Sequence, residues 1–283
     1  MDRKRVCWIA KWLVFMGLAN SLLAWMGNLS SGLPEEAVQI GFTTGGTQAA
    51  ALESLRPPAE EIGISALPAS RPDAAAEIGA KPGKETPVMA LTFDDGPHKE
   101  NTGRILDALE QYGAKATFFI VGNRIAGREA VIARMEDLGM EIGNHTFDHV
   151  NLKKISLDEV EQQIEMTNQA LYPLLGHGAE LVRPPYGTVG KAAAQRIPYP
   201  LIHWTVDTED WKTREQQAVY QAVMEAAKQD FSLVLLHDFY DTTAQALERA
   251  IPELVQKGVR LVTVSEFYQA KGVNLEPGKL YRG

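Results

Sequence analysis

From Thr86 onward, short apolar runs alternate with longer amphipathic stretches, and this alternation constrains the fold more than any other feature of the sequence. The pattern is typical of repeated β-α units around a mostly parallel sheet. We therefore predict an α/β fold, a distorted (β/α) barrel with about seven parallel strands. The expected strands are Val88–Phe93, Ala116–Val121, Met140–Gly143, Leu181–Arg183, Leu201–Val206, Leu233–Leu236 and Arg260–Val264.

Helical patterns separate most of these strands, and several carry start and stop signals. Helices are expected to start at Asn101, Ser156 and Thr213. Ser156 and Thr213 are each followed three residues later by Glu or Gln, which permits a reciprocal cap of the first turn. Glycine accepts the left-handed backbone that often ends a helix. The glycines placed to do so are Gly113, Gly139 and Gly258.

The first residues combine a basic start with an apolar run. Basic residues up to Lys11 precede the run from Trp12 to Met26. This order is typical of a secretory signal or an uncleaved signal-anchor whose downstream chain is exported. The run is shorter than the ~20 residues that span a bilayer, and no Ala-x-Ala cleavage site follows, so both forms stay open. A buried helix of the folded domain is the weaker alternative, because a polar stretch isolates the run.

Residues 28–85 are rich in Ala, Gly, Pro, Ser and Glu and show no sustained apolar period. Such a segment cannot bury enough surface to offset its chain entropy, so we expect a flexible linker. The predicted organisation is a signal peptide or membrane anchor over 1–27, this linker over 28–85 and a folded domain over 86–283.

Charge and cysteine content exclude two classes of site. The formal net charge is -8 and the sequence pI is near 5.4, so the chain offers no overall basic surface for nucleic acid. Cys7 is the single cysteine, so the chain can form neither an intramolecular disulfide nor a Cys-rich zinc site. Any metal ion must be held by histidines and carboxylates.

Reactive side chains follow the predicted strands. The carboxyl ends of the strands of a β/α barrel converge on one face, so we expect these sequence-distant residues to meet in one cleft. They are Asp94 and Asp95 after the first strand, His145 and His149 after the third, Arg183 at the end of the fourth, Asp207 and Asp210 after the fifth and His237 after the sixth.

Two of these segments suggest a metal ion. The four-residue spacing of His145 and His149 brings two imidazoles to one side of a helical turn, and one added carboxylate would complete a site with open positions for water and substrate. Two ordinary surface histidines are the alternative. Asp94 and Asp95 would repel each other without a nearby cation, although an Asx-type turn through Gly96 is also compatible with this sequence.

The remaining segments are ambiguous when taken singly. The two prolines and the glycine of Arg183–Gly187 predict a rigid loop, whose alternative function is a structural turn. His237 follows a strongly apolar run, where a buried core histidine is the usual finding. His98 and His177 are expected at the surface and His203 in a strand.

Taken together, the segments resemble the five motifs of the polysaccharide deacetylase family, also called the NodB-homology domain or carbohydrate esterase family 4. The similarity runs from about Val88 to Lys271 and leaves the first 85 residues uncovered. The motifs in order are Thr92–Pro97, His145–His149, Arg183–Gly187, Asp207–Trp211 and Leu235–His237.

The resemblance implies a role for each matching residue. Asp95, His145 and His149 would hold a divalent metal ion, with zinc favoured over cobalt, nickel, manganese and iron. The other implied roles are Asp94 as general base, Arg183 as its ion-pair partner, His237 as general acid, Asp210 as the residue that orients and tunes His237, the backbone N–H of Tyr186 as oxyanion donor, and Trp211 with Leu235 as the pocket for the acetyl methyl.

The resemblance also implies the activity, a metal-dependent removal of N-acetyl groups from N-acetylglucosamine-type residues of an extracellular polysaccharide, with peptidoglycan or a chitin-like polymer as substrate. An acetylxylan-type O-deacetylase and a non-catalytic carbohydrate-binding module are the alternatives. A serine hydrolase fits poorly, because the chain has no Gly-x-Ser-x-Gly segment. We expect an exported, extracellular or cell-surface monomer that contacts the membrane only through its N-terminal segment.

Overall fold

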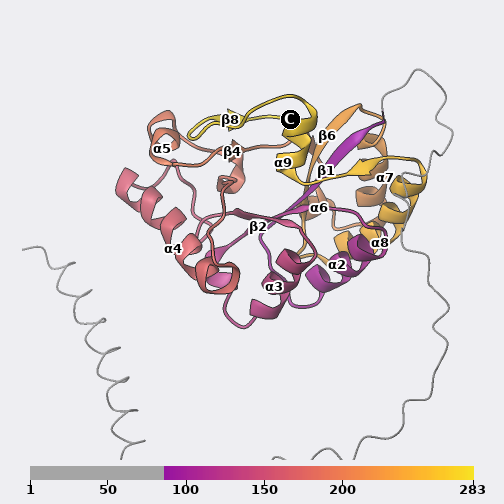
Figure 1. The fold of residues 1–283 in the computed structure, drawn as a ribbon, viewed down its shortest axis with the longest axis horizontal. Coiled ribbons are helices and arrows are strands. Elements are labelled where there is room, and N and C mark those ends of the chain that lie inside the picture. The colour runs from indigo at the N-terminus through magenta and orange to yellow at the C-terminus, as the bar shows by residue number, and fades with distance from the viewer. Residues whose placement is uncertain (1–85) are drawn as a thin grey trace, which may run out of the picture. The chain divides into compact units, whose positions relative to one another are not determined.

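The computed structural model describes residues 86–283, so the expected signal or anchor over 1–27 and the linker over 28–85 lie outside the described residues. Within 86–283, no helix combines the length and the apolar character that crossing a membrane requires. The described chain is an α/β fold whose strands pair in parallel (Figure 1).

The strand β1 (Val88–Asp94) lies at the centre of the sheet and is buried along its whole length. It pairs with β6 from Val88↔Phe231 to Asp94↔His237, which places the ends of both strands side by side. The sheet order is β3-β2-β1-β6-β5, with β7 also paired to β1. The other strands are β2 (Thr117–Ile120), β3 (Glu141–Asn144), β4 (Leu201–Ile202), β5 (Val206–Asp207), β6 (Phe231–His237), β7 (Arg260–Leu261) and β8 (Leu280–Tyr281).

Three strand predictions need correction. Leu181–Arg183 forms only single bridges through Val182, because the prolines that follow have no N–H group to continue a ladder. Leu201–Val206 divides into β4 and β5, which pair with different neighbours, β8 and β6. Arg260–Val264 stops at Leu261, because Thr263 already caps the next helix.

A closed barrel is not confirmed. Between residues 86 and 283 the continuous ladder ends at β3 and β5, and only the bridges Asn144↔Val182 and Val182↔Leu201 extend it toward β4. The pair β4-β8 was not predicted, because β8 is only two residues long.

The helices pack around this sheet, and most of their expected ends are confirmed. Ser156 and Glu159 form a complete capping box, and Gly113, Gly139 and Gly258 all take positive φ beyond helix ends. Thr213 is instead the last residue of a short helix, so the start predicted there is wrong. The helices are α2 (Asn101–Gln111), α3 (Glu129–Asp137), α4 (Leu157–Leu175), α5 (Lys191–Arg196), α6 (Asp210–Thr213), α7 (Gln216–Ala226), α8 (Asp241–Gln256) and α9 (Val264–Ala270), with 3-10 turns η1 (Gly122–Arg124) and η2 (Pro185–Gly187).

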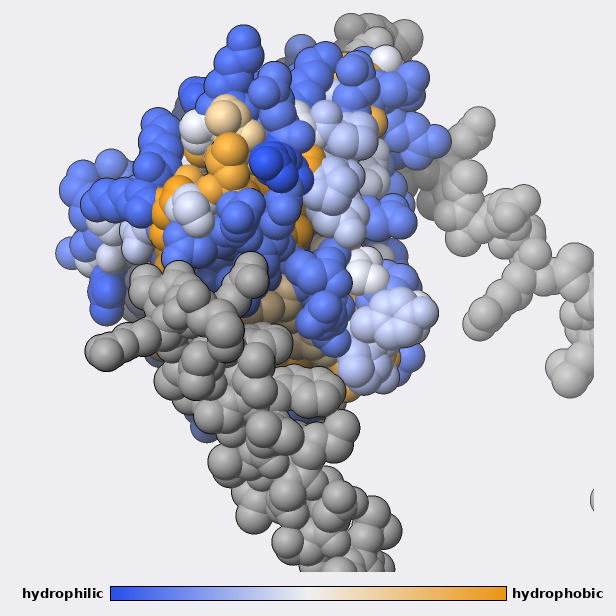
Figure 2. Space-filling view, turned by 90° about the vertical axis from the view of Figure 1, so that its left-hand side faces the viewer, coloured by the Kyte–Doolittle hydropathy of each residue, from blue (hydrophilic) through white to orange (hydrophobic). Residues whose placement is uncertain are grey.

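The two faces of β1 pack against different clusters of apolar residues. Met89, Leu91 and Phe93 point into the larger core, which α2 and α8 cover. Val88 and Ala90 point to the other face, against Phe267 of α9 and its neighbours. Because side chains alternate along a strand, Thr92 and Asp94 continue this second face. The side of the molecule that carries α4 and α5 shows mainly hydrophilic residues with a limited apolar area (Figure 2).

Candidate active site

A cavity of about 450 Å³ lies at the carboxyl ends of the strands. Its lining contains nine residues that the sequence singled out and two aromatic residues that it did not. The lining residues are Asp94, Asp95, His145, His149, Tyr186, Trp204, Asp207, Trp211, Leu235, His237 and Tyr240. Arg183 and Asp210 lie behind this lining as fully buried partners. The expected convergence of these segments is therefore observed.

Asp94 is held by a buried guanidinium. Arg183 has no exposed surface, and its Nη1 lies 2.8 Å from Oδ1 of Asp94 and 2.7 Å from the hydroxyl of Thr92. Its other groups donate to the carbonyl oxygens of Ile202 and His203. Burial raises the pKa of Asp94, but the charge and hydrogen bond of Arg183, together with the charges of His145 and His237, outweigh burial and hold this pKa below its ordinary value. Asp94 is therefore an ionised carboxylate at neutral pH.

Asp95 turns toward the same cavity through an unusual backbone. β1 ends at Asp94, and Asp95 has a left-handed φ of 72°. Neighbouring side chains in a continuous strand would point to opposite faces, so this turn lets both carboxylates line one cavity. The Oδ1 atom of Asp95 is buried without a hydrogen-bond partner. A buried, unpartnered carboxylate oxygen is the kind of group that a cation satisfies.

His145 and His149 lie beside this oxygen. His149 Nε2 is 3.1 Å and His145 Nε2 is 3.8 Å from Oδ1 of Asp95, and ligand atoms of all three residues lie within 4.8 Å of one another. Nδ1 of His145 is 2.7 Å from the carbonyl oxygen of Arg183. A carbonyl can only accept, so Nδ1 donates and the Nε2 lone pair is left free for a metal ion. The donor set thus fits a divalent metal.

His145 and His149 do not lie on the helical turn that their spacing predicted. Residues 145–149 form a loop and not a helical turn, with left-handed φ values of 66° at Thr146 and 53° at His149. The side chain of Gln163 on α4 accepts the N–H groups of Phe147 and Asp148 and so supports this loop. Burial and the neighbouring His145 lower the pKa of His149, which favours the neutral imidazole that binds metals.

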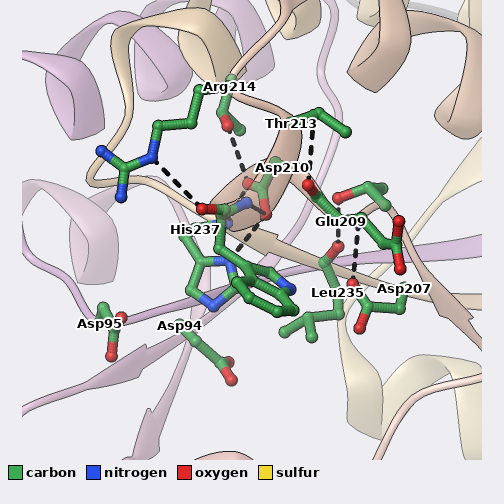
Figure 3. A network of polar contacts seen from close by, with 12 residues as sticks. Asp94, Asp95, Asp207, Glu209, Asp210, Thr213, Arg214, Leu235 and His237 are labelled. Atoms are coloured by element: carbon green, nitrogen blue, oxygen red, sulfur yellow. Dashed lines mark hydrogen bonds and ion pairs between the residues drawn. The ribbon is translucent and has the colours of Figure 1, made fainter.

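His237 is fixed by a second buried carboxylate. Asp210 accepts from Nδ1 of His237 at 2.8 Å and from the backbone N–H of His237 at 2.8 Å. The N–H of Trp211 and the hydroxyl of Thr243 also donate to this carboxylate, each at 2.8 Å. Burial lowers the pKa of His237, but the hydrogen bond and charge of Asp210 reverse that effect and raise the pKa to about 9. Figure 3 shows the ring between Asp210 and the pair Asp94 and Asp95.

The remaining predicted residues also reach the cavity. Tyr186 takes a φ of 59° inside η2 and is 63% exposed, with its ring packed edge-on against His149. Trp211 at the start of α6 is 46% exposed, whereas Leu235 of β6 is buried. Among residues 86–283, the group of possible metal ligands does not include His98, His177 or His203. His177 is exposed as expected and His98 is half-buried, whereas His203 lies between β4 and β5 and not in a strand.

Sequence reasoning missed three residues at or beneath the cavity. Trp204 stacks on His203 and lines the cavity where the expected strand divides, and Tyr240 lies 5.9 Å from the ring of His237. Asp238 is fully buried and accepts from the hydroxyl of Thr102 at 2.5 Å. Asp238 could have been suspected, since a charged residue follows the apolar run of β6. The contacts of Trp204 and Tyr240 depend on tertiary structure.

The comparisons with known proteins agree with this geometry. A sequence profile described as polysaccharide deacetylase matches residues 81–199. Peptidoglycan-N-acetylglucosamine deacetylase PgdA of Listeria monocytogenes is 41% identical over 160 residues, which cover 56% of this chain and 34% of PgdA. The structure of peptidoglycan deacetylase PdaC from Bacillus subtilis is 38% identical with a TM-score of 0.64, and the match covers 66% of this chain and 92% of that structure. The chain belongs to the polysaccharide deacetylase family.

Another similar structure of this family contains a metal ion. A family 4 acetyl xylan esterase from Clostridium thermocellum, solved in complex with cobalt, is 32% identical with a TM-score of 0.64. The match covers 69% of this chain and 97% of that structure. The part of this chain that matches PgdA covers only 34% of the length of PgdA. These similar structures agree with the α/β fold of the described residues.

Gly96 provides a test of the turn that carries Asp95. A methyl group on Gly96 would lie 2.3 Å from Oδ2 of Asp238, closer than atoms can pack. In Gly96→Ala, either Asp238 or the turn must move, so we expect metal affinity to fall about tenfold, the lower end of losses from changes around metal ligands. Calorimetric titration with Zn²⁺ measures this. Gly190→Ala is the matched control, because nothing lies within 4 Å of that position. Equal affinities of the two variants would contradict the packing argument.

Proposed function

We propose that this protein is a metal-dependent deacetylase that hydrolyses N-acetyl groups on N-acetylglucosamine-type residues of an extracellular polysaccharide. One observation carries the proposal. A carboxylate kept ionised by Arg183 and an imidazole kept protonated by Asp210 face one cavity, beside a cluster suited to a metal ion. Hydrolysis of an amide needs a base for the attacking water and an acid for the departing amine.

Asp94 is the proposed base. Its Oδ1 is occupied by Arg183, and its Oδ2 lies 3.6 Å from Nε2 of His145, on the side of the metal ligands. Oδ2 is therefore the oxygen that accepts the proton of the attacking water. The paired guanidinium keeps the carboxylate unprotonated before each turnover, so the base is ready at neutral pH.

Asp95, His145 and His149 are the proposed metal ligands. When bound there, a divalent ion supplies a Lewis acid that lowers the pKa of coordinated water to roughly 7 and polarises the acetyl carbonyl. Two imidazoles and one carboxylate suit zinc, and the same set also accepts cobalt, nickel, manganese or iron. We propose zinc as the native ion.

Tyr186, Trp211 and Leu235 are the proposed contacts of the acetyl group. Tyr186 lines the cavity in a left-handed turn, and its backbone N–H is the proposed donor to the oxyanion of the tetrahedral intermediate. Loss of one such donor costs about 3 kcal/mol in well-studied hydrolases. Trp211 and Leu235 supply apolar surface for the acetyl methyl.

His237 is the proposed acid. Its Nδ1 is committed to Asp210, so Nε2 is the atom that donates a proton to the departing amine. With a pKa of about 9, the imidazole is protonated at neutral pH before the amine leaves. Asp210 is a positioning residue, because it acts through His237.

Peptidoglycan is the proposed substrate, because the similar proteins PgdA and PdaC are both named as peptidoglycan deacetylases. Chitin-like polymers are the runner-up. The similar acetyl xylan esterase makes O-deacetylation of acetylxylan a second candidate activity. We propose that the protein is exported and acts at the cell surface as a monomer, with 86–283 as the catalytic domain.

Acetate release tests the proposal directly. The zinc-loaded full-length protein should release acetate from peptidoglycan glycan strands without releasing sugar or phosphate, and a chelator should abolish this activity until zinc is restored. Faster release from acetylxylan would favour the O-deacetylase. No acetate from peptidoglycan, chitin oligomers or acetylxylan would instead support a non-catalytic carbohydrate-binding protein.

The adjacent aspartates should respond differently to amide substitution. Asp95→Asn should weaken zinc binding and regain activity in excess zinc, because an amide oxygen is a poorer ligand than a carboxylate. Asp94→Asn should retain near-normal zinc affinity but lose turnover by ~100-fold to 10,000-fold, the usual size of a general-base contribution, without rescue by zinc. Calorimetric titration and acetate release on both variants measure this. The opposite pattern would mean that the two roles are exchanged.

Asp210 should set the alkaline limb of the pH dependence. The pKa of His237 is raised, so the acid is present below about pH 9 and is lost as pH rises through this value. Asp210→Asn removes the raising charge while burial still lowers the pKa, so the alkaline limb should move down by roughly one to three pH units. Rates of acetate release across pH measure the shift. Thr213→Val is a control on the same helix. An unchanged limb in Asp210→Asn would exclude the proposed tuning.

A further inference from the structure

Two guanidinium groups flank the aromatic loop that leaves β6 beside His237. Arg214 lies over the ring of Tyr240, 4.5 Å from its centroid, and Arg124 lies over the ring of Phe239, at 5.1 Å. Tyr240 lines the cavity, and Phe239 is 45% exposed. We call Arg124, Arg214, Phe239 and Tyr240 the cationic rim.

The rim is continuous with the catalytic groups. The ring of Tyr240 lies 5.9 Å from His237 on one side and 5.9 Å from Phe239 on the other. Both guanidinium groups lower the pKa of the Tyr240 phenol, against the larger raising effect of burial. Arg124 also donates to the carbonyl oxygen of Asp95. The two positive charges are therefore close enough to act on a molecule bound in the cavity.

Neither rim arginine is neutralised by a carboxylate among residues 86–283. Arg104, Arg134, Arg183 and Arg196 all form ion pairs, whereas Arg124 and Arg214 donate only to backbone carbonyl oxygens. The chain as a whole carries a formal charge of -8. Two guanidinium groups without a carboxylate partner at the edge of the cavity leave an anion-binding capacity that the protein itself does not use.

The contacts of Arg214 place its side chain at the rim. Arg214 follows α6 with a left-handed φ of 52°, a conformation that is costly for a residue with a long side chain. Its Nε donates to the carbonyl oxygen of Trp211, which fixes the guanidinium over Tyr240. In the view of Figure 3, Arg214 lies above His237, on the side opposite Asp94 and Asp95.

We propose that the cationic rim recognises a carboxylate on the polysaccharide, so that the preferred substrate is an N-acetylated glycan with carboxylate-bearing substituents and not a neutral polymer. The inference rests on the proposed deacetylase function and narrows its substrate class. A planar guanidinium matches the two oxygens of a carboxylate, and the rings beneath it keep it in place. A positive charge at the edge of a binding site mainly speeds the association of an anionic substrate, and salt weakens this attraction by screening.

The test compares two synthetic tetrasaccharides of N-acetylated glucosamine units. In one, alternate units carry a 3-O-lactyl carboxylate; in the other, the same lactyl groups are carboxamides, equal in shape but uncharged. Acetate release by the zinc-loaded full-length protein gives kcat/KM for each. We expect the carboxylate form to be preferred about three- to tenfold at low salt, with the preference disappearing at high salt as the charges are screened.

Variants assign the preference to the rim. Arg214→Gln should reduce the preference to near unity, mainly through KM, and Arg214→Lys should retain part of it. Arg249→Gln is the matched control, because Arg249 lies 3.8 Å over the ring of Tyr220 on α7, among residues that do not line the cavity. Equal kcat/KM for the two tetrasaccharides in the unmodified protein, or an equal loss of preference in Arg249→Gln, would overturn the rim proposal alone. No acetate from either substrate would overturn the deacetylase function with it.

Discussion

The buried ion pair between Arg183 and Asp94 organises the cavity. Burying two charges is unfavourable, and the pair is tolerated because nearly all of its donors and acceptors are used. Removing one partner of such a pair costs about 3–5 kcal/mol. The backbone carbonyl of the same arginine accepts the ring Nδ1–H of His145. One residue therefore fixes the ionisation of the base through its side chain and the tautomer of a metal ligand through its main chain.

Strained backbone is concentrated around this pair. Each left-handed residue other than glycine costs about 1–3 kcal/mol and persists only where its surroundings impose it. In residues 86–283, all of these positions except Arg214, which follows α6, lie in segments that come directly after a strand or after the bridge at Val182, and most line the cavity or flank a lining residue. They are Asp95, Thr146, His149, Tyr186, Glu209 and Arg214. The packed sheet supplies the stability that holds these loops in conformations useful for binding and catalysis.

The contrast between a regular sheet and irregular loops explains which features could be predicted from the sequence. Apolar runs are local features, so the central strands and the polar residues after them were placed correctly. The division of Leu201–Val206 into β4 and β5 could not be predicted. Ile202 pairs with β8 and Thr205 bonds to β6, and the local apolar pattern does not show either partner. Likewise, the spacing of His145 and His149 indicated proximity, but the left-handed residues that produce it leave no sequence signal. Asp238 and Trp204 depend on contacts with residues far along the chain.

The two buried ion pairs shift the pKa values of Asp94 and His237 in opposite directions. These two pKa values set the pH range in which the base is ionised and the acid is protonated. Arg183 keeps the pKa of Asp94 below its ordinary value, so the base is available as pH rises above that range. Asp210 raises the pKa of His237 to about 9, so the acid is available until pH exceeds that value. A cation near Asp94 and Asp95 would offset the smaller contributions of these two carboxylates to the pKa of His237, but the hydrogen bond that His237 donates to Asp210 would remain. Neutral pH therefore lies inside the interval in which both groups hold the protonation state that amide hydrolysis requires.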